Sequence, residues 1–374
     1  MARKLRVFEA FAGIGAQASA LERLNINYEI VGISDWFTDA IICYDAIHTK
    51  SNPQKLPSYE EMISYLSKFE FSRDSVNPCD IRKLSHEDIE RLYVANKNTK
   101  NYGSIVKLDP NSLPKIDMLI YSFPCQDLST GGKCLGMAKG SGTRSGLLWE
   151  VERILLGLKE KNNLPEYLLL ENVKTLLAKS NSRDFGKWLA FLESLGYEND
   201  TPMLVNAMDH GVPQERIRAF VVSHLGNKLN VEARIKKQPH EYRFENFFRA
   251  DYSKPILRQE ADDAQLNPTP SRQKMWVINH RKLNTPVNTI TCNMDRSNCA
   301  GLFSYKGKLG DSFRRLTIRE AFLLMGFSEE EYERTLPLGY SYRRMNKLIG
   351  NSIVVNVLTT IFRAMIGNKY NRKN

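Results

Sequence analysis

Short apolar runs that alternate with helical patterns dominate the first 225 residues of the chain. The runs are LRVFEAF (5–11), YEIVGIS (28–34), IDMLIYSF (116–123), YLLLENV (167–173) and RAFVVSHL (218–225). They lack the regular polar alternation of surface strands, which indicates strands buried on both faces. The pattern predicts an α/β fold: a doubly wound, mostly parallel sheet with helices on both faces and ligands at the carboxyl ends of its strands.

Length, charge and cysteine content restrict the class of protein. A chain of 374 residues is longer than a single core usually supports, so two domains are expected. The 53 Lys and Arg exceed the 42 Asp and Glu, which suits a polyanionic partner, although many basic enzymes share this excess. The cysteines form no C-x-x-C pair, so neither a zinc site nor a disulfide framework is predicted. Without a signal sequence or about 18 consecutive apolar residues, a cytoplasmic protein is expected.

A change in helical periodicity and charge along the sequence indicates the second domain. Residues 228–312 show no long helical period and carry 15 Lys and Arg against 9 Asp and Glu. We interpret them as a separate, smaller, basic domain; a long solvated insertion is the alternative. Helical signals then return, with a capping box in TIRE (317–320), a helix end at Gly326 and an apolar stripe along 351–367. We therefore expect residues 1–227 to form the large domain and 313–374 to return to it.

A further polar segment, about 50–110, separates the second apolar run from the third. It reads as helical, and the sequence SHED (85–88) could cap a helix there. Nothing in its composition assigns it a function.

The stretch FEAFAGIGAQ (8–17) predicts a ligand-binding turn between a strand and a helix. Gly13 and Gly15 permit a tight turn and close approach of a ligand to the backbone. The next apolar run ends in SDWF, where Asp35 could accept hydrogen bonds from a ribose and Trp36 could offer its ring to an adenine. Together they favour an adenosine-containing cofactor. Alternatively, Gly13 only permits helix packing and Trp36 only fills a core.

Cys125 follows the third apolar run in the sequence FPCQ, at the expected end of a central strand. A thiolate is the strongest side-chain nucleophile near neutral pH, and the six glycines of 129–146 suit a loop that closes over a substrate. A catalytic role is preferred over a packing role. Glu171 ends the next apolar run, where a protonated carboxyl could donate to a ring nitrogen, the alternative being a helix cap.

The sequence QERIRAF (214–220) places Gln214, Arg216 and Arg218 at a spacing of two. In an extended segment all three side chains would project to one face. Such a donor cluster could hold a carboxylate, a phosphate or a base edge.

The motifs FEAFAGIG, SDWF, FPCQ, ENV, QERIR, RRLTIREAFLLMGF and GNSIVVNVL, in this order, closely resemble the cytosine-C5 DNA methyltransferase family of bacterial restriction–modification systems. The resemblance covers about 1–48, 115–225 and 313–365. It implies the Rossmann-like fold of class I methyltransferases, S-adenosylmethionine as cofactor and double-stranded DNA as substrate. It also implies a monomer in the bacterial cytoplasm, with a companion restriction endonuclease as candidate partner. The basic region 228–312 lies where the family places its target-recognition domain.

The resemblance also implies roles for individual residues, with no metal ligand among them. Cys125 would attack C6 of a flipped-out cytosine, Glu171 would bind N3 and the amino group, and Arg216 and Arg218 would orient the base and the catalytic residues. The implied cofactor-binding residues are Phe11, Gly13, Gly15, Asp35, Trp36, Asp80, Ile81, Pro124, Leu147, Asn351 and Ser352. The implied substrate-binding residues are Gln126, Ser129, Asn172, Gln214 and Arg296, the last as a candidate guanine contact for which a phosphate contact or solvent exposure is the alternative.

Three other functions stay open on the sequence alone. An RNA cytosine-C5 methyltransferase could use the same scaffold, and a silent DNA-binding regulator could keep the fold. A nicotinamide-dependent oxidoreductase is disfavoured because no third glycine completes G-x-G-x-x-G.

Overall fold

The computed structural model describes residues 3–49, 55–124, 128, 136–140, 144–238, 243–266, 286–294, 303–307 and 310–371. The chain divides into two compact units. Unit 1 comprises Met1–Val205, Ile217–Ile235 and Ile361–Asn374, and unit 2 comprises Asn206–Arg216 and Lys236–Thr360. The predicted Cys125, Gln126, Ser129 and Arg296 lie outside the described residues.

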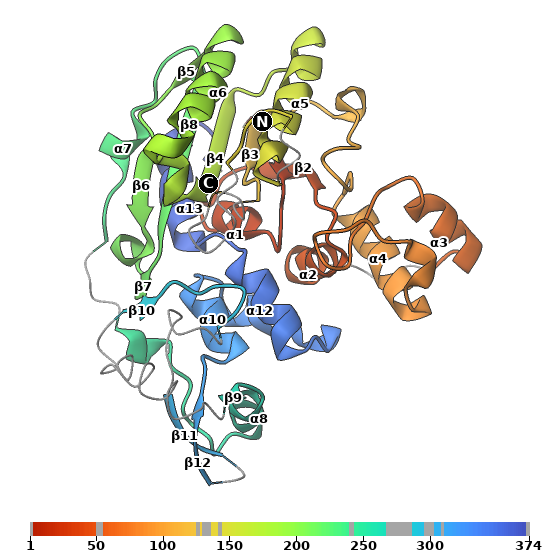
Figure 1. The fold of residues 1–374 in the computed structure, drawn as a ribbon, viewed down its shortest axis with the longest axis vertical. Coiled ribbons are helices and arrows are strands. Elements are labelled where there is room, and N and C mark those ends of the chain that lie inside the picture. The colour runs from red at the N-terminus through yellow and green to blue at the C-terminus, as the bar shows by residue number, and fades with distance from the viewer. Residues whose placement is uncertain are drawn as a thin grey trace. The chain divides into compact units, whose positions relative to one another are not determined.

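The described part of unit 1 contains a mixed sheet in the order β2-β1-β3-β4-β8-β5, with β6 paired to β8 (Figure 1). The strands are β1 (Leu5–Ala10), β2 (Tyr28–Ser34), β3 (Met118–Tyr121), β4 (Tyr167–Val173), β5 (Tyr197–Asn199), β6 (Met203–Asn206) and β8 (Ile217–Leu225). The five predicted strands are confirmed within a few residues. Strands β2, β1, β3 and β4 pair in parallel, as expected, and the sheet is mixed because β8 runs antiparallel to both β4 and β5. Strands β5, β6 and β8 follow one another through short connections, whereas a parallel crossover needs about a dozen residues.

The helices of unit 1 pack on a sheet whose central strands are mostly buried. All four residues of β3 are buried, which explains the missing polar alternation. On one face, Leu119, Leu168 and Leu170 join a core cluster with Leu155 of α5 (Leu148–Glu160) and Trp188 of α6 (Ser182–Ser194). The other helices of the first 235 residues are α1 (Ala16–Glu22), α2 (Thr38–His48), α3 (Tyr59–Leu66), α4 (His86–Asn98) and α7 (Val231–Arg234), with short 3-10 turns at Ile81–Lys83, Pro110–Ser112, Arg144–Leu147, Lys174–Leu177, Lys179–Asn181 and Ala207–His210.

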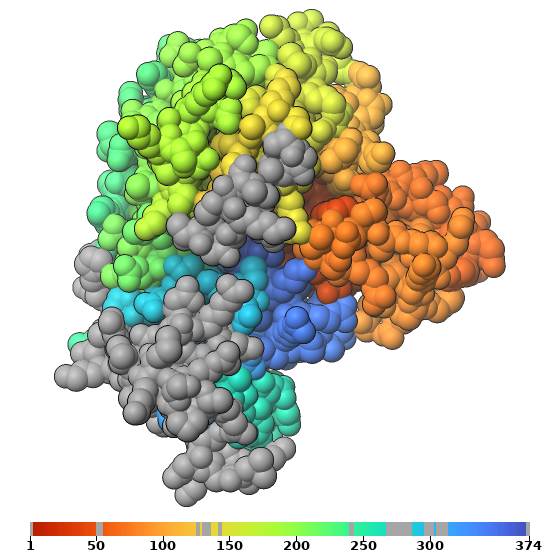
Figure 2. Space-filling model, in the orientation of Figure 1, coloured from red at the N-terminus to blue at the C-terminus, as the bar shows by residue number. Residues whose placement is uncertain are grey.

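The polar segment before β3 folds as two capped helices. Ser85 caps α4 by accepting a hydrogen bond from the backbone N–H of Asp88, as predicted. Ser58 and Glu61 form a capping box at α3. Figure 2 shows this segment, in orange, as a lobe on the surface of unit 1. We call residues 55–104 the added lobe.

Unit 2 consists of small sheets and short helices joined by buried ion pairs. Strands β11 (Phe303–Gly307), β12 (Gly310–Arg314) and β9 (Gln265–Leu266) form an antiparallel sheet, and β7 (Gln214–Glu215) pairs with β10 (Val287–Asn288). Its described helices are α8 (Pro255–Asp263), α10 (Ile318–Leu324), α11 (Glu329–Glu333), α12 (Tyr342–Gly350) and the first part of α13 (Val355–Ile366), with 3-10 turns at Phe244–Asn246 and Leu336–Leu338. Thr317 forms the predicted capping box at α10 with Glu320.

The boundaries of the two units differ from the expected 1–227, 228–312 and 313–374. Arg314 and Glu320 form a fully buried ion pair, and Arg319 of α10 binds Glu260 of α8 at 3.0 Å. The Arg319–Glu260 pair, like the ion pair of Arg249 with Glu329 at 2.8 Å, ties residues after 313 to those before it, and 313–360 belong to unit 2. Only Ile361–Asn374 return to unit 1, beginning within α13 (Val355–Ile366).

Among the residues that the structure describes, one helical stretch, Tyr342–Ile366, has the length and composition of a membrane span. However, 72% of its most apolar window is buried inside the structure, as is typical of a core helix. A single stretch of this kind is weak evidence for a membrane protein.

Candidate active site

The glycine turn after β1 has a left-handed backbone at three of five positions. Phe11, Gly13 and Gly15 have φ angles of 59°, 58° and 79°. A Cβ at Gly15 would lie 2.3 Å from Nε2 of His48, so both the backbone angle and the available space require glycine there. At Gly13 no atom stands within 4 Å of such a Cβ, and the φ angle alone favours glycine.

Asp35 connects the end of β2 to this turn. One of its carboxylate oxygens accepts a hydrogen bond from Gly13 N (2.8 Å) and the other from Phe37 N (2.8 Å). Burial raises the pKa of Asp35 to about 6, even though these backbone hydrogen bonds act in the opposite direction. Asp35 therefore holds the turn in place, whatever further group it binds.

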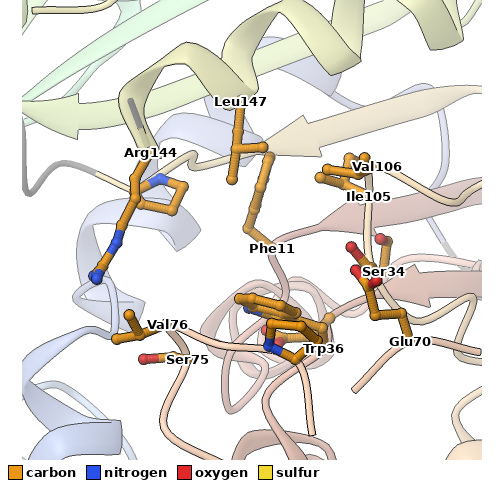
Figure 3. Close-up of a pocket in the computed structure, with 14 residues that line it drawn as sticks. Phe11, Ser34, Trp36, Glu70, Ser75, Val76, Ile105, Val106, Arg144 and Leu147 are labelled. Carbon is orange, nitrogen blue, oxygen red and sulfur yellow. The ribbon is translucent and has the colours of Figure 1, made fainter. Parts of the chain in front are cut away.

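A pocket of ≈ 340 Å³ opens at the ends of β1 and β2, within unit 1 (Figure 3). This volume falls in the range of about 300–1,000 Å³ that is common for small-molecule sites. Its lining residues are Phe11, Ser34, Asp35, Trp36, Glu70, Ser75, Val76, Pro78, Ser104, Ile105, Val106, Pro124, Arg144 and Leu147. The structure thus brings together five of the predicted cofactor residues, Phe11, Asp35, Trp36, Pro124 and Leu147.

Asp80 and Ile81 do not line this pocket, in contrast to the expectation for them. Asp80 caps a 3-10 turn by accepting a hydrogen bond from Arg82 N at 3.1 Å, and Ile81 is buried. The added lobe reaches the pocket instead through Glu70, Ser75, Val76 and Pro78, and at its end through Ser104.

Sequence reasoning missed the pocket residues of the added lobe and Arg144. Glu70 stands between two phenylalanines in a polar stretch, so no local pattern indicates a binding residue. Arg144 lies three positions before Leu147 at the end of the glycine-rich loop. Its closeness to a predicted cofactor residue could have indicated that Arg144 also lines the pocket.

Glu171 and Arg218, two of the residues predicted to be catalytic, form an ion pair in the described part of unit 1. They lie on the neighbouring antiparallel strands β4 and β8. Arg218 Nε is 3.5 Å from Glu171 Oε1, and both side chains are largely buried, with exposed fractions of 18% and 9%. A buried carboxylate needs such a cationic partner, so Arg218 can fix the orientation of Glu171.

Asn172 links the Glu171 strand to the segment that precedes Cys125. Its Nδ2 donates to the carbonyl oxygen of Phe123 at 3.0 Å. Ser145 Oγ donates to the next carbonyl oxygen, that of Pro124, at 2.8 Å. Asn172 is buried and has a structural contact that the sequence did not assign to it.

Gln214, Arg216 and Arg218 do not form one donor cluster in the described structure. The extended segment is interrupted at Arg216, since β7 ends at Glu215 and β8 begins at Ile217. Gln214, fully buried, donates to Leu324 O (2.9 Å) and accepts from Ile290 N (3.0 Å) within unit 2.

Arg216 is buried in unit 2 and donates to backbone carbonyl oxygens. Its Nη1 donates to Ile290 O (2.8 Å), and its Nη2 donates to Ser352 O (2.7 Å) and Gly350 O (3.3 Å). Asn351 Oδ1 lies 2.8 Å from the Cys292 Sγ. Arg216 therefore holds the loop at 290–292 against the GNS sequence, in which Asn351 and Ser352 were predicted to bind the cofactor.

The described residues contain no group of three or more His, Cys, Asp or Glu side chains that could hold a metal ion.

Comparisons with known proteins identify the family. The model of the C-5 cytosine-specific DNA methylase family matches residues 61–367. The chain is 38% identical over 382 residues to the orphan methyltransferase M.SssI of Spiroplasma monobiae, with 96% of each covered. It is 36% identical over 379 residues to the type II methyltransferase M2.ScrFI of Lactococcus lactis subsp. cremoris, with 96% of this chain and 99% of the other covered.

Solved structures agree on the fold. The structure resembles the Dnmt2 methyltransferase of S. pombe with a TM-score of 0.60 at 18% identity, covering 97% of this chain and 98% of that one. It resembles the methyltransferase EhMeth of Entamoeba histolytica with a TM-score of 0.60 at 16% identity, covering 98% and 99%. At such identities the likeness shows the mixed α/β fold alone. Together with the family match, the described geometry leads to one conclusion: the chain belongs to the C-5 cytosine-specific DNA methylase family and is a DNA (cytosine-5-)-methyltransferase.

Proposed function

We propose that the protein methylates C5 of a flipped-out cytosine in double-stranded DNA through a covalent bond between Cys125 and C6. The observation that carries this proposal is the Glu171–Arg218 pair on adjacent strands. The Asn172–Phe123 hydrogen bond supports it, because it ties the Glu171 strand to the residues just before Cys125.

The family implies S-adenosylmethionine as the methyl donor, and the pocket of unit 1 suits it. Phe11, Trp36 and Leu147 offer apolar surface for a purine and a thioether. The carboxylates of Asp35 and Glu70 can accept from the hydroxyl and amino groups of an adenosine, and Arg144 offers a positive charge to the methionine carboxylate. When bound, the cofactor supplies an electrophilic methyl group.

The residues of the chain make the cytosine reactive enough to accept that methyl group. Cys125 adds as a thiolate to C6, and the electron pair of the C5–C6 bond moves toward N3, where Glu171 donates a proton or hydrogen bond. C5 is then an enamine carbon and takes the methyl group. A base removes the C5 proton, the C6–S bond breaks to return the Cys125 thiolate, and N3 gives its proton back to Glu171 as the ring is restored.

The thiolate must reach the face of the base, which is covered in a stacked duplex, so the nucleotide must leave the helix. Arg218 keeps the Glu171 carboxyl group aligned until the base arrives. We further propose that unit 2, which carries most of the basic region 228–312, recognises the target sequence. A protective role in a bacterial restriction–modification system, with a companion endonuclease, is proposed from the type II relative M2.ScrFI.

Trapping with a duplex that contains 5-fluorocytosine tests the mechanism, because fluorine at C5 prevents the final elimination. We expect a covalent protein–DNA adduct that maps to residue 125 by mass spectrometry and that Cys125→Ala lacks. Glu171→Gln should lower the rate of methyl transfer strongly with nearly unchanged cofactor affinity. A Cys125→Ala variant that still methylates DNA would rule out the covalent route.

Transfer of labelled methyl groups to duplex DNA and to tRNA compares the two nucleic acid substrates directly. Bisulfite sequencing of the methylated DNA then identifies the recognition sequence. Incorporation confined to tRNA would contradict the proposed substrate.

A further inference from the structure

The added lobe supplies one wall of the pocket assigned above to the cofactor. Glu70, Ser75, Val76 and Pro78 line the pocket from the connection between α3 and α4. Val76, 44% exposed, is one of the large apolar side chains that the protein leaves accessible to solvent. The lobe therefore takes part in the site and is more than a surface appendage.

Hydrogen bonds fix the lobe to the residues that form the opposite wall. Ser72 N donates to Trp36 O (2.7 Å), and Thr38 N donates to Ser72 O (3.0 Å). Asn101, 3% exposed, accepts from Asp35 N through Oδ1 and donates to Asp35 O through Nδ2, both at 3.0 Å. These contacts set the position of Glu70 relative to Asp35 and Trp36.

The backbone at Glu70 is also held from the far end of the lobe. Gly103 has a φ angle of 69°, and a Cβ there would lie 3.1 Å from Phe69 Cβ and 3.3 Å from Glu70 O. Ser34 Oγ donates to Gly103 O at 2.8 Å. The chain around Glu70 thus packs closely on a glycine that is itself bonded to the end of β2.

The Glu70 carboxylate differs from that of Asp35 in its partners. Asp35 accepts a backbone hydrogen bond at each oxygen. For Glu70, no side-chain hydrogen bond or ion pair is found among the described residues. Figure 3 shows the Glu70 side chain beside Ser34, on the same side of the pocket as Ile105 and Val106. Within the described part of the chain it is an acceptor without a donor, beside the apolar side chains of the pocket.

We propose that Glu70 accepts a hydrogen bond from the exocyclic amino group of the adenine of the cofactor. The inference rests on the proposed assignment of this pocket to S-adenosylmethionine. Trp36, Ile105 and Leu147 provide the apolar surfaces that suit a flat base, and Glu70 stands at the edge of that space. A carboxylate there binds an amino group and repels the carbonyl oxygen of a 6-oxopurine, so Glu70 selects adenine.

Binding of two purine analogues tests this role without requiring turnover. The ligands are S-adenosylhomocysteine and S-inosylhomocysteine, which differ at the purine 6-position, and their dissociation constants are measured by isothermal titration calorimetry. The variants are Glu70→Ala, Glu70→Gln and, as a matched control, Glu60→Ala, which removes an exposed carboxylate of the same lobe. Thermal melting of each variant confirms folding.

We expect the wild type and Glu60→Ala to prefer the adenosyl ligand by about tenfold or more, the scale of one hydrogen bond to a charged group. Glu70→Ala should lose most of this preference because its adenosyl affinity falls and its inosyl affinity does not. Glu70→Gln, which keeps an acceptor oxygen, should retain an intermediate preference.

Two results would overturn the inference and leave the cofactor pocket in place. One is an unchanged preference in Glu70→Ala, and the other is an equal loss of affinity for both ligands, which would indicate a contact with the ribose or a structural role. Failure of the wild type to bind either ligand would instead overturn the cofactor assignment itself.

Discussion

Arg216 offers a sharp contrast between the role that its motif implies and the contacts that it makes. The family resemblance predicts that it orients the base and the catalytic residues. In the structure its guanidinium is 4% exposed and donates to the carbonyl oxygens of Ile290, Gly350 and Ser352. We therefore expect Arg216→Met, which keeps much of the side-chain volume but removes the donors, to destabilise unit 2.

The size of the effect follows from the acceptors that lose their partner. Two of the three hydrogen bonds are short, at 2.8 and 2.7 Å, and the third is weaker at 3.3 Å. A buried acceptor left without a donor costs about 1–3 kcal/mol. Two such carbonyl oxygens, with a small contribution from the third, give an expected loss of about 2–6 kcal/mol.

Hydrogen exchange with mass spectrometry measures this loss locally, which matters because a chain with two units need not unfold in one step. The informative amides are Ile290 N, which donates to Gln214 Oε1, and Ser352 N, which donates to Ile349 O. Exchange at these positions should be at least about thirtyfold faster in Arg216→Met, the equivalent of 2 kcal/mol. Arg343→Ala, which removes an exposed arginine of α12, serves as the control and should change neither amide.

The opposite outcome is equally informative. If Arg216→Met keeps wild-type protection at both amides while methyl transfer falls, the residue acts on the substrate and the structural interpretation is refuted. If protection and activity both fall, Arg216→Lys should restore part of the protection, since its ammonium can still reach one or two of the carbonyl oxygens.

Three further perturbations test other parts of the structure. Gly350→Ala should lower the free energy of unfolding by about 2 kcal/mol or more in urea denaturation, because its Cβ would lie 2.3 Å from the backbone N of Cys292. As a control, Gly186→Ala, in an open helical position, should raise the free energy of unfolding by about 0.5–1 kcal/mol. Equal changes in the free energy of unfolding for the two variants would contradict the packing argument. Gly15→Ala should weaken S-adenosylhomocysteine binding in calorimetry, because φ there is 79°, and wild-type affinity would refute the need for that turn. Burial raises the pKa of Glu9 from its ordinary 4.5 to about 8. Between these pH values the folded protein holds a proton that the unfolded chain has lost, so the free energy of unfolding should fall by about 1.4 kcal/mol per pH unit. Urea denaturation at several pH values should show this slope in the wild type and not in Glu9→Gln, and identical slopes would refute the role of Glu9.

Apolar runs and helix-capping side chains were sufficient to predict the central strands and two of the helix starts from the sequence. The five central strands are long, apolar runs, and the helix starts at Ser85 and Thr317 carry their own capping side chains. The short strands β5 and β6 have no comparable run, and they exist because they pair with β8. The sheet is mixed because β8 runs antiparallel to β4 and β5, and this pairing depends on several segments of the chain.

The predicted domain boundary and the predicted position of Asp80 differ from the structure because both depend on contacts between residues far apart in sequence. The boundary of unit 2 depends on buried ion pairs such as Arg319 with Glu260, 59 positions apart in sequence. The position of Asp80 has a similar cause, since the fold of the added lobe directs Glu70 and Ser75 to the pocket and places Asp80 at a turn cap. Motif order could identify the chemistry, but it could not show which of several acidic residues reaches the ligand.

The two carboxylates of the pocket explain why the added lobe and the glycine turn must act together. Asp35 uses one oxygen to hold Gly13 and the other to hold Phe37, so its orientation is set by the turn. Its own backbone N–H and carbonyl oxygen are both bonded to Asn101 of the lobe. Movement of the lobe would therefore displace Asp35, Glu70 and the glycine turn at the same time. Because one buried side chain links the wall that the lobe supplies to the turn after β1, the lobe is an integral part of the proposed cofactor site, although it interrupts the family motifs in sequence.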